Sequence, residues 1–183
     1  MDTVSKTTYN DKELMEISGR GRYELVKGVL HEMSPSGKRH GLITSKLHYL
    51  LASYVYSKKL GQLTAAETGF KISANPDTVK APDIAFISNE KLKEDDNLDG
   101  YSMVMPELVV EVNSPYDVYN EIIDKVNDWL QAGVKEVWVV EPKSKTVVIH
   151  NINKVRSLKN YEELTSEAIL PEFKCKVWEI FDI

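Results

Sequence analysis

The sequence has little of several features that would assign a protein to a broad class at once. Its single cysteine, Cys175, excludes an intrachain disulfide and suits a reducing compartment. No stretch approaches the roughly 18 apolar residues of a membrane span, and no apolar segment like a signal peptide follows the polar first residues. We therefore expect a soluble, cytoplasmic protein with no membrane association.

Basic residues are also too few to give the whole chain an attraction for nucleic acid. The 23 Lys and Arg are outnumbered by 28 Asp and Glu, and the formal net charge is −5. Because phosphate contacts come mainly from Lys and Arg, any nucleic-acid binding must rest on local basic clusters. Lys38 and Arg39 form one such cluster, although a solvated surface is the more common explanation for any single cluster.

What the chain does contain is enough apolar sequence for one substantial core. Hydrophobic residues make up 42% of the 183 residues, a length that corresponds to one domain. Residues 1–21 are mostly polar with a short helical pattern, and we interpret them as an N-terminal arm. We interpret residues 22–183 as a single domain.

Alternating strand and helix patterns predict a mixed α/β sheet covered by helices. Two short strand-like runs flank Lys27-Gly28, a signal for a two-residue hairpin. Apolar residues recur at three- and four-residue steps over 40–60 and again over 116–132, as in amphipathic helices. Further strands are expected near residues 62–66, 69–72, 82–87, 108–112, 137–140 and 146–150. This order favours a mixed sheet with helices on its faces and an N-terminal hairpin.

Two acidic residues lie in runs that otherwise predict buried strands. Asp83 is near the start of Pro82-Asp83-Ile84-Ala85-Phe86-Ile87, and Glu111 interrupts Leu108-Val109-Val110-Glu111-Val112. An ionised carboxylate taken out of water costs on the order of several kcal/mol unless a cation or hydrogen-bond donors compensate it. The simplest shared partner is a hard divalent metal ion held by oxygen ligands.

The strand around Glu111 and the helix after it contain further candidates. Alternation along the strand places Glu111 and Asn113 on the same face. On the helix, an advance of about 100° per residue places Lys125 on the apolar side, between Ile122 and Trp129. An ammonium group there either extends to water or meets a buried anion, and Glu111 lies on the preceding strand.

Glu24 and His40 are weaker candidates when each is taken alone. Glu24 lies on the first strand of the predicted hairpin, where a strand with one wet face often carries an outward glutamate. His40 follows the basic pair at a predicted helix start, where backbone N–H groups favour a phosphate. By itself, His40 is interpreted as a surface histidine.

Several of these segments occur together, and in the same order, in one known family. The segments are Arg22-Tyr23-Glu24-Leu25-Val26-Lys27-Gly28, Met33-Ser34-Pro35 with His40, Ala81-Pro82-Asp83-Ile84-Ala85-Phe86, Pro106-Glu107-Leu108-Val109-Val110-Glu111-Val112-Asn113-Ser114-Pro115, and Lys125 with Trp129-Leu130-Gln131-Ala132-Gly133-Val134. From about Arg22 to the C-terminus, the chain resembles the Uma family of putative restriction endonucleases, within the PD-(D/E)XK nuclease superfamily. The resemblance implies a restriction-endonuclease-like core that acts on DNA with magnesium.

The resemblance also assigns roles to individual positions. It makes Asp83 the motif aspartate and Glu111 the second acid. Asn113 stands where the superfamily has its motif lysine, and Lys125 is the natural replacement because this family places a lysine at that helical position. Glu24 matches the family's additional upstream acid.

These assignments lead to a hypothesis about mechanism. Asp83, Glu111 and the backbone carbonyl of Val112 would bind Mg²⁺, with Mn²⁺ as a substitute, and Glu24 would complete the shell directly or through water. Lys125 would orient the attacking water or stabilise charge on the phosphate. A neighbouring phosphate would contact Lys38, Arg39 and His40.

The function predicted from these residues is endonucleolytic hydrolysis of DNA. The expected partner is duplex DNA and the expected assembly a homodimer, since cutting both strands usually needs two sites. The main alternative is an inactive nuclease-like module that binds nucleic acid or a protein, which the acidic net charge and Asn113 favour. A hydrolase of small phosphoesters is a weaker alternative, and a pure interaction protein would leave three acids and Lys125 without a purpose.

Overall fold

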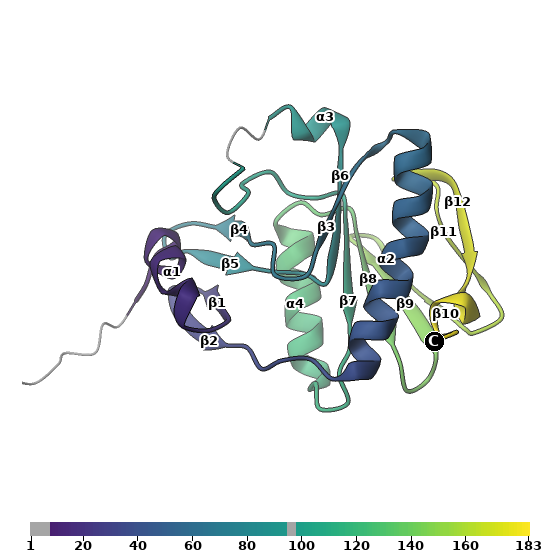
Figure 1. The fold of residues 1–183 in the computed structure, drawn as a ribbon, viewed down its shortest axis with the longest axis horizontal. Helices are drawn as coiled ribbons and strands as arrows, with labels where there is room; N and C mark the ends of the chain where they lie inside the picture. Colours follow the sequence, from purple (N-terminus) through teal and green to yellow (C-terminus); the bar gives the residue numbers. More distant parts are fainter. Residues whose placement is uncertain (1–7, 95–97) are drawn as a thin grey trace, which may run out of the picture.

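A six-stranded mixed sheet forms the centre of the computed structural model, which describes residues 8–94 and 98–183 (Figure 1). Its strands lie in the order β10-β9-β8-β7-β6-β3. They are β3 (Gly61–Ala65), β6 (Ile84–Ser88), β7 (Leu108–Val112), β8 (Glu136–Glu141), β9 (Thr146–Asn151) and β10 (Lys154–Leu158). Neighbours run antiparallel except β7 and β8, which are parallel and are connected through helix α4 (Tyr119–Gln131). The predicted mixed α/β sheet flanked by helices is confirmed.

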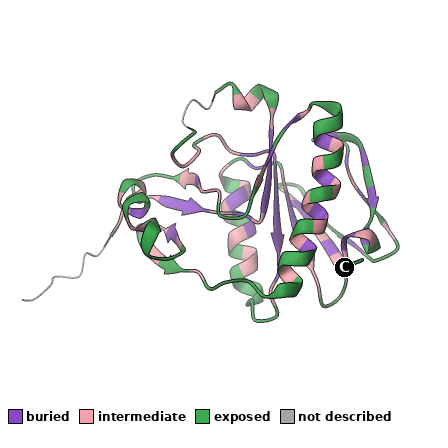
Figure 2. Cartoon of the chain, viewed as in Figure 1, coloured by how far each residue is buried: buried purple, intermediate pink, exposed green. Residues whose placement is uncertain are grey.

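The two long helices cover opposite faces of this sheet. Helix α2 (Lys38–Lys58) buries Ile43, Leu47, Leu51 and Val55 against one face. Helix α4 buries Val126 and Trp129 against the other. In Figure 2 the buried positions of both helices face the sheet, as their apolar periodicity predicts. A hairpin of β11 (Glu163–Ser166) and β12 (Leu170–Lys176), with helix α5 (Val177–Ile180), extends the core on the α2 side.

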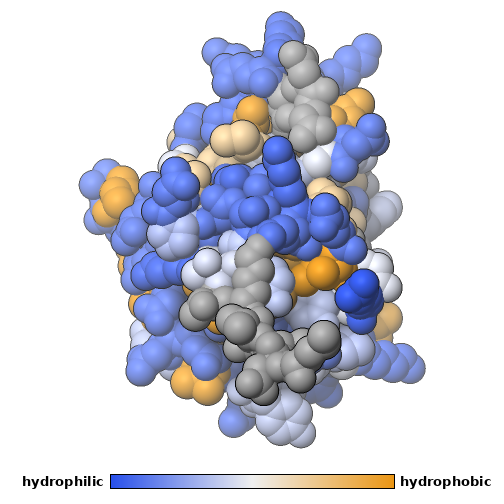
Figure 3. Space-filling model, turned by 90° about the vertical axis from the view of Figure 1, so that its left-hand side faces the viewer, coloured by the Kyte–Doolittle hydropathy of each residue, from blue (hydrophilic) through white to orange (hydrophobic). Residues whose placement is uncertain are grey.

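A smaller four-stranded sheet, in the order β2-β1-β5-β4, forms an N-terminal lobe. Its strands are β1 (Tyr23–Val26), β2 (Val29–Glu32), β4 (Phe70–Ser73) and β5 (Thr78–Lys80). Lys27 and Gly28 both have positive φ, as the two-residue turn between β1 and β2 requires. The outward face of this lobe is largely hydrophilic, with separate apolar spots (Figure 3).

The segment before the hairpin packs onto this lobe. Helix α1 (Asp11–Ile17) buries Leu14 against Leu25 and Val79, and the turn Ser18–Arg20 leads from α1 towards β1. Residues 1–7 of the predicted arm lie outside the described residues. No helix in the described ranges is long and apolar enough to cross a bilayer.

Several elements differ from the sequence prediction. Strand β5 was not predicted, because three residues between Pro76 and Pro82 show too little alternation to indicate a strand. Strands β10, β11 and β12 and helices α3 (Asn89–Leu92) and α5 were also not predicted. Helix α4 starts at Tyr119, three residues later than expected, because Ser114 and Asp117 form a hydrogen-bonded turn.

Candidate active site

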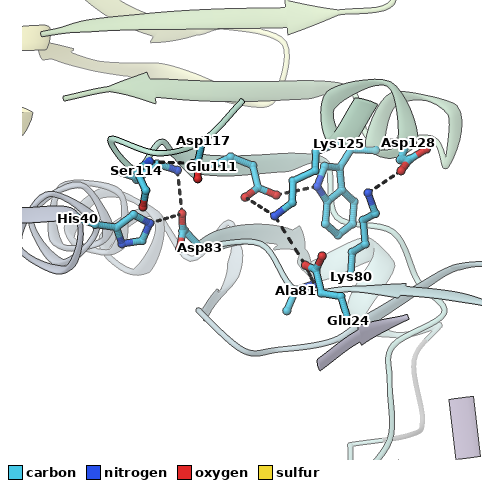
Figure 4. Close-up of polar contacts among 12 residues, drawn as sticks. Glu24, His40, Lys80, Ala81, Asp83, Glu111, Ser114, Asp117, Lys125 and Asp128 are labelled. Atoms are coloured by element: carbon cyan, nitrogen blue, oxygen red, sulfur yellow. Dashed lines mark hydrogen bonds and ion pairs between the residues drawn. The ribbon is translucent and has the colours of Figure 1, made fainter. Parts of the chain in front are cut away.

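Two acidic side chains meet at neighbouring positions of adjacent strands. Asp83 directly precedes β6, and Glu111 is the fourth residue of β7. These strands pair antiparallel with Ile84 opposite Val110, and this register places Asp83 level with Glu111. Figure 4 shows the two carboxylates in one site. A hollow of about 420 Å³, lined in part by Asp83, opens beside them.

Asp83 is held by two donors from different elements. Its Oδ2 accepts a hydrogen bond from the Val112 N–H at 2.8 Å and lies 3.1 Å from the His40 Nε2. The His40 side chain is only 11% exposed, so its interpretation as a surface histidine is wrong. The first turn of α2 places the imidazole ring against Asp83. The hydrogen bond to Asp83 raises the pKa of His40 above its ordinary value, although burial opposes this.

Glu111 is buried among groups that change its pKa in opposite directions. Its Oε1 accepts a hydrogen bond from the Trp129 indole N–H at 2.9 Å, and its Oε2 lies 3.8 Å from the Lys125 Nζ. Burial raises the pKa of Glu111 to about 7, and the nearby carboxylates of Asp83 and Glu24 act in the same direction, against Lys125. Asp83, Glu24 and Glu111 thus lie near a single lysine, and the charged form of Glu111 is disfavoured in this site.

Lys125 is shared between two acids. Its Nζ lies 3.8 Å from Glu24 Oε1 and 3.8 Å from Glu111 Oε2 (Figure 4). Glu24 is buried, so it is not the outward glutamate of a solvated strand, and its Oε1 accepts the Ala81 N–H at 3.2 Å. The charge of Glu111 raises the pKa of Lys125 well above its ordinary value. Lys125 therefore stays protonated at neutral pH and cannot act as a general base.

The basic residues at the start of α2 lie apart from the acids. Lys38 and Arg39 are exposed and line a different groove from the one that His40 lines. The structure therefore brings His40 to the acids, while the other two predicted phosphate contacts face a neighbouring surface.

Two contacts at this site were not predicted from the sequence. Asn113 was expected to face the same site as Glu111, and its amide donates to the carboxylate of Glu141 at the end of β8. The second contact is the hydrogen bond from Trp129 to Glu111. Trp129 follows Lys125 by four residues, so helical periodicity placed it nearby without indicating its polar role.

A second lysine, which is buried, crosses from the N-terminal lobe to α4. Lys80 on β5 places its Nζ 2.5 Å from the Asp128 Oδ2, one turn along α4 from Lys125 (Figure 4). No sequence pattern indicated this pair, because β5 itself was not predicted.

Comparison with known proteins identifies the family and the fold of the chain. The Uma2 family, described as "Putative restriction endonuclease", matches residues 10–178. The chain belongs to this family. Its fold is also that of a crystal structure described as a "putative nuclease belonging to DUF820" from Anabaena variabilis, with a TM-score of 0.76 and 15% sequence identity, covering 88% of this chain and 90% of that one. No curated protein is significantly similar in sequence.

Membership of the Uma2 family confirms the resemblance seen in the sequence and supports a nuclease. Restriction-endonuclease-like proteins generally use divalent metal ions, so the fit of such an ion to these residues matters. The side chains of Asp83 and Glu111 offer hard carboxylate oxygens, which Mg²⁺ and Mn²⁺ prefer as ligands. Burial chiefly, and the nearby carboxylates of Asp83 and Glu24, raise the pKa of Glu111, and a cation bound beside Glu111 would stabilise its charged form.

The site is not a cage of three acidic ligands. Within residues 8–94 and 98–183, no three His, Cys, Asp or Glu side chains are grouped closely enough to hold a metal ion. Lys125 contacts both Glu24 and Glu111 and so lies between these two acids. Mg²⁺ usually keeps several waters and needs only one or two carboxylates, so Asp83 and Glu111 are a sufficient acidic set.

Proposed function

We propose that this Uma2 protein is a metal-dependent endonuclease that hydrolyses phosphodiester bonds of DNA. The main support is the position of Lys125, a permanently charged ammonium shared by two buried acids beside Asp83. A structural ion pair needs only one acid for one lysine. Three acids around one lysine suit a site that also receives a divalent cation and an anionic substrate.

Asp83, Glu111 and the Val112 carbonyl are the groups that would hold Mg²⁺ or Mn²⁺, with Glu24 contributing directly or through water. When bound, the metal ion supplies Lewis acidity, which polarises the phosphate and lowers the pKa of a bound water. The Trp129 indole fixes the orientation of Glu111, and the Val112 N–H fixes that of Asp83.

Lys125 would stabilise the negative charge that develops on the scissile phosphate. Its Nζ lies beyond hydrogen-bond distance of both Glu24 and Glu111, so neither acid holds its N–H groups in a fixed direction. These donors can turn to a phosphate oxygen without breaking a hydrogen bond to either acid. Protonated throughout, Lys125 acts through charge and position.

The substrate, the assembly and the remaining contacts complete the proposal. We infer that duplex DNA is cut by a homodimer, since two strands need two sites. His40, which orients Asp83, would contact a phosphate beside the site, while Lys38 and Arg39, which line the neighbouring groove, would contact a phosphate further along the strand. The one cysteine, Cys175, is a buried free thiol, which suits work in the cytoplasm.

Supercoiled plasmid tests this proposal directly. The wild-type protein should nick or linearise plasmid with Mg²⁺ or Mn²⁺ and should stop when EDTA is added. Asp83→Asn, which weakens metal binding, should lose on the order of 10³-fold in rate. The proposal fails if folded wild-type protein cleaves neither plasmid nor linear duplex in the presence of Mg²⁺ or of Mn²⁺. It also fails if Asp83→Asn cleaves as fast as wild type.

An inactive nuclease-like module is the second candidate, and one observation favours it. The described residues contain no ready-made group of three metal-binding side chains, and Asn113 is engaged by Glu141. Titration calorimetry with Mn²⁺ separates the two candidates. An inactive module should take up little metal, whereas a nuclease should bind it in a way that Asp83→Asn weakens.

A further inference from the structure

A second groove lies next to the candidate active site, between the start of α2, the β8–β9 turn and the residues that follow α5. Its volume is about 570 Å³. We call it the basic groove and define it by six lining residues: Lys38, Arg39, Leu42, Lys143, Lys145 and Phe181. It does not include the acids of the candidate site.

The charge of the basic groove is opposite to that of the chain. Four cations line it and no Asp or Glu is among its described lining residues, although the net charge of the protein is −5. None of the four forms an ion pair with a described residue, whereas Lys58, Lys71 and Lys176 all do. Like charges gathered from two separate elements repel one another, and a bound polyanion relieves that repulsion.

Apolar side chains also line the basic groove. Leu42 on α2 is 44% exposed, and Pro142 and Phe181 line the same groove. A phosphate ion or the outside of a duplex makes no use of these apolar side chains, because a duplex keeps its bases inside. An unpaired strand offers both its phosphates and the flat faces of its bases.

The basic groove adjoins the candidate active site along the chain, although the described residues that line the two hollows are different. Lys38 and Arg39 directly precede His40, whose ring contacts Asp83. On the other side, Pro142 and Lys143 follow Glu141, which accepts the amide of Asn113 just after β7. A strand that leaves the phosphate beside Asp83 towards the start of α2 would reach the groove next.

We propose that the basic groove binds an unpaired segment of a nucleic-acid strand. Lys38, Arg39, Lys143 and Lys145 contact its phosphates, and a base packs on Leu42 and Phe181. This deepens the proposed function and rests on it for one point, that the bound segment continues from the strand being cut. The preferred substrate then carries single-stranded DNA beside the cleaved bond.

Binding without cleavage tests this proposal separately from the nuclease activity. Fluorescence anisotropy in EDTA would measure the affinity for a labelled single strand of about 20 nucleotides and for its duplex, across a range of NaCl concentrations. The test variant is Lys143→Ala/Lys145→Ala. The matched control, Lys93→Ala/Lys154→Ala, changes the net charge equally, from −5 to −7. Both control residues are exposed and neither is among the described residues that line the groove: Lys93 directly follows α3, and Lys154 is the first residue of β10.

The groove variant should bind the single strand about tenfold more weakly. The slope of log affinity against log salt should also shrink by about 1.4, or 0.7 per lost phosphate contact. The affinity of the control variant should match that of wild type within about twofold, because its two lysines would not contact the bound nucleic acid. Leu42→Ser should weaken binding of the single strand by about threefold and leave duplex binding unchanged.

Three results would overturn the proposal. The first is equal binding by the groove variant and its control, which would leave only a general charge effect. The second is an equal loss for duplex and single strand, which would indicate phosphate contacts alone. The third is a Leu42→Ser protein that binds the single strand as well as wild type. These binding measurements contain no metal and do not depend on cleavage. If the protein binds single strands as expected but does not cleave DNA, the groove proposal is supported and the nuclease proposal fails.

Discussion

Two lysines, one buried and one half-buried, connect the N-terminal lobe to helix α4, and they do so in different ways. Lys80 on β5 is 5% exposed and places its ammonium 2.5 Å from one carboxylate, that of Asp128. Lys125 on α4 is 32% exposed and stands 3.8 Å from two carboxylates, Glu24 of the lobe and Glu111 of the central sheet. The first lysine is fully engaged, and the second is shared.

This difference between the contacts of Lys80 and Lys125 distinguishes a structural ion pair from a candidate catalytic site. The Lys80–Asp128 pair satisfies its charges locally and holds β5 against α4. Around Lys125, two acids face one ammonium and a third, Asp83, lies nearby, so the acids outnumber the lysine; burial chiefly, together with Asp83 and Glu24, raises the pKa of Glu111 to about 7. Retaining such an imbalance costs stability, which is expected at sites kept for function.

The largest effect on stability should come from Glu111 and should depend on pH. In metal-free folded protein its carboxyl keeps a proton up to about pH 7, while the unfolded chain releases it near pH 4.5. The unfolding free energy therefore falls as pH rises through this window, by up to about 3 kcal/mol. Glu111→Gln lacks this ionisation. The unfolding free energy of the variant, relative to that of wild type, should therefore rise by up to that amount between about pH 5 and pH 8.

Urea denaturation in EDTA at both pH values measures this gain. Glu121→Gln, at an exposed position of α4, controls for the amide substitution and should show a much smaller pH-dependent change. A constant difference between Glu111→Gln and wild type at both pH values would contradict the imbalance inferred around Lys125.

Removing the engaged lysine should cost stability by an intermediate amount. Lys80→Met leaves Asp128 without its partner, and because Asp128 is 34% exposed and can be rehydrated, we expect a loss of about 1–3 kcal/mol. Adding Asp128→Leu to Lys80→Met should recover part of the lost stability, and a double-mutant cycle measures this coupling.

Lys125→Met should lower the unfolding free energy by about 1 kcal/mol or less at neutral pH, because Glu111 can take up a proton. Equal losses for the two lysine variants would erase the distinction between them.

The smallest effect is expected at Glu24. Glu24→Gln removes one of the two acids that face Lys125 but leaves Glu111 in place, so the ammonium keeps its position and its charge. The rate of plasmid cleavage should fall by about tenfold or less. A loss as large as that of Asp83→Asn would contradict this ranking and would make Glu24 a direct ligand of the metal, in place of a ligand through water.

Much of the central fold could be predicted because local pattern and tertiary environment agree there. Helix α2 shows its apolar face in the spacing of Ile43, Leu47, Leu51 and Val55, and β7 is too apolar to be anything but buried. Strand β5 is three residues long and owes its existence to pairing with β1 and β4, which no local pattern reveals. Lys80 was missed with it.

The acids of the site could be predicted because a carboxylate in an apolar strand is unusual. Asp83 and Glu111 stood out for that reason, and Lys125 because it interrupts the apolar face of its helix. His40 was misjudged because its burial depends on how α2 crosses the end of the sheet, which is a tertiary property. The hydrogen bond from Trp129 to Glu111 depends on tertiary packing in the same way.

The most direct test compares the two lysines in one cleavage experiment. Wild type, Lys125→Met and Lys80→Met would be incubated with supercoiled plasmid and Mn²⁺ at a temperature where all three are folded. We expect Lys125→Met to lose about 10²–10³-fold in rate and Lys80→Met to stay within about threefold of wild type. Equal rates for wild type and Lys125→Met would contradict the account, since the shared ammonium would then take no part in cleavage.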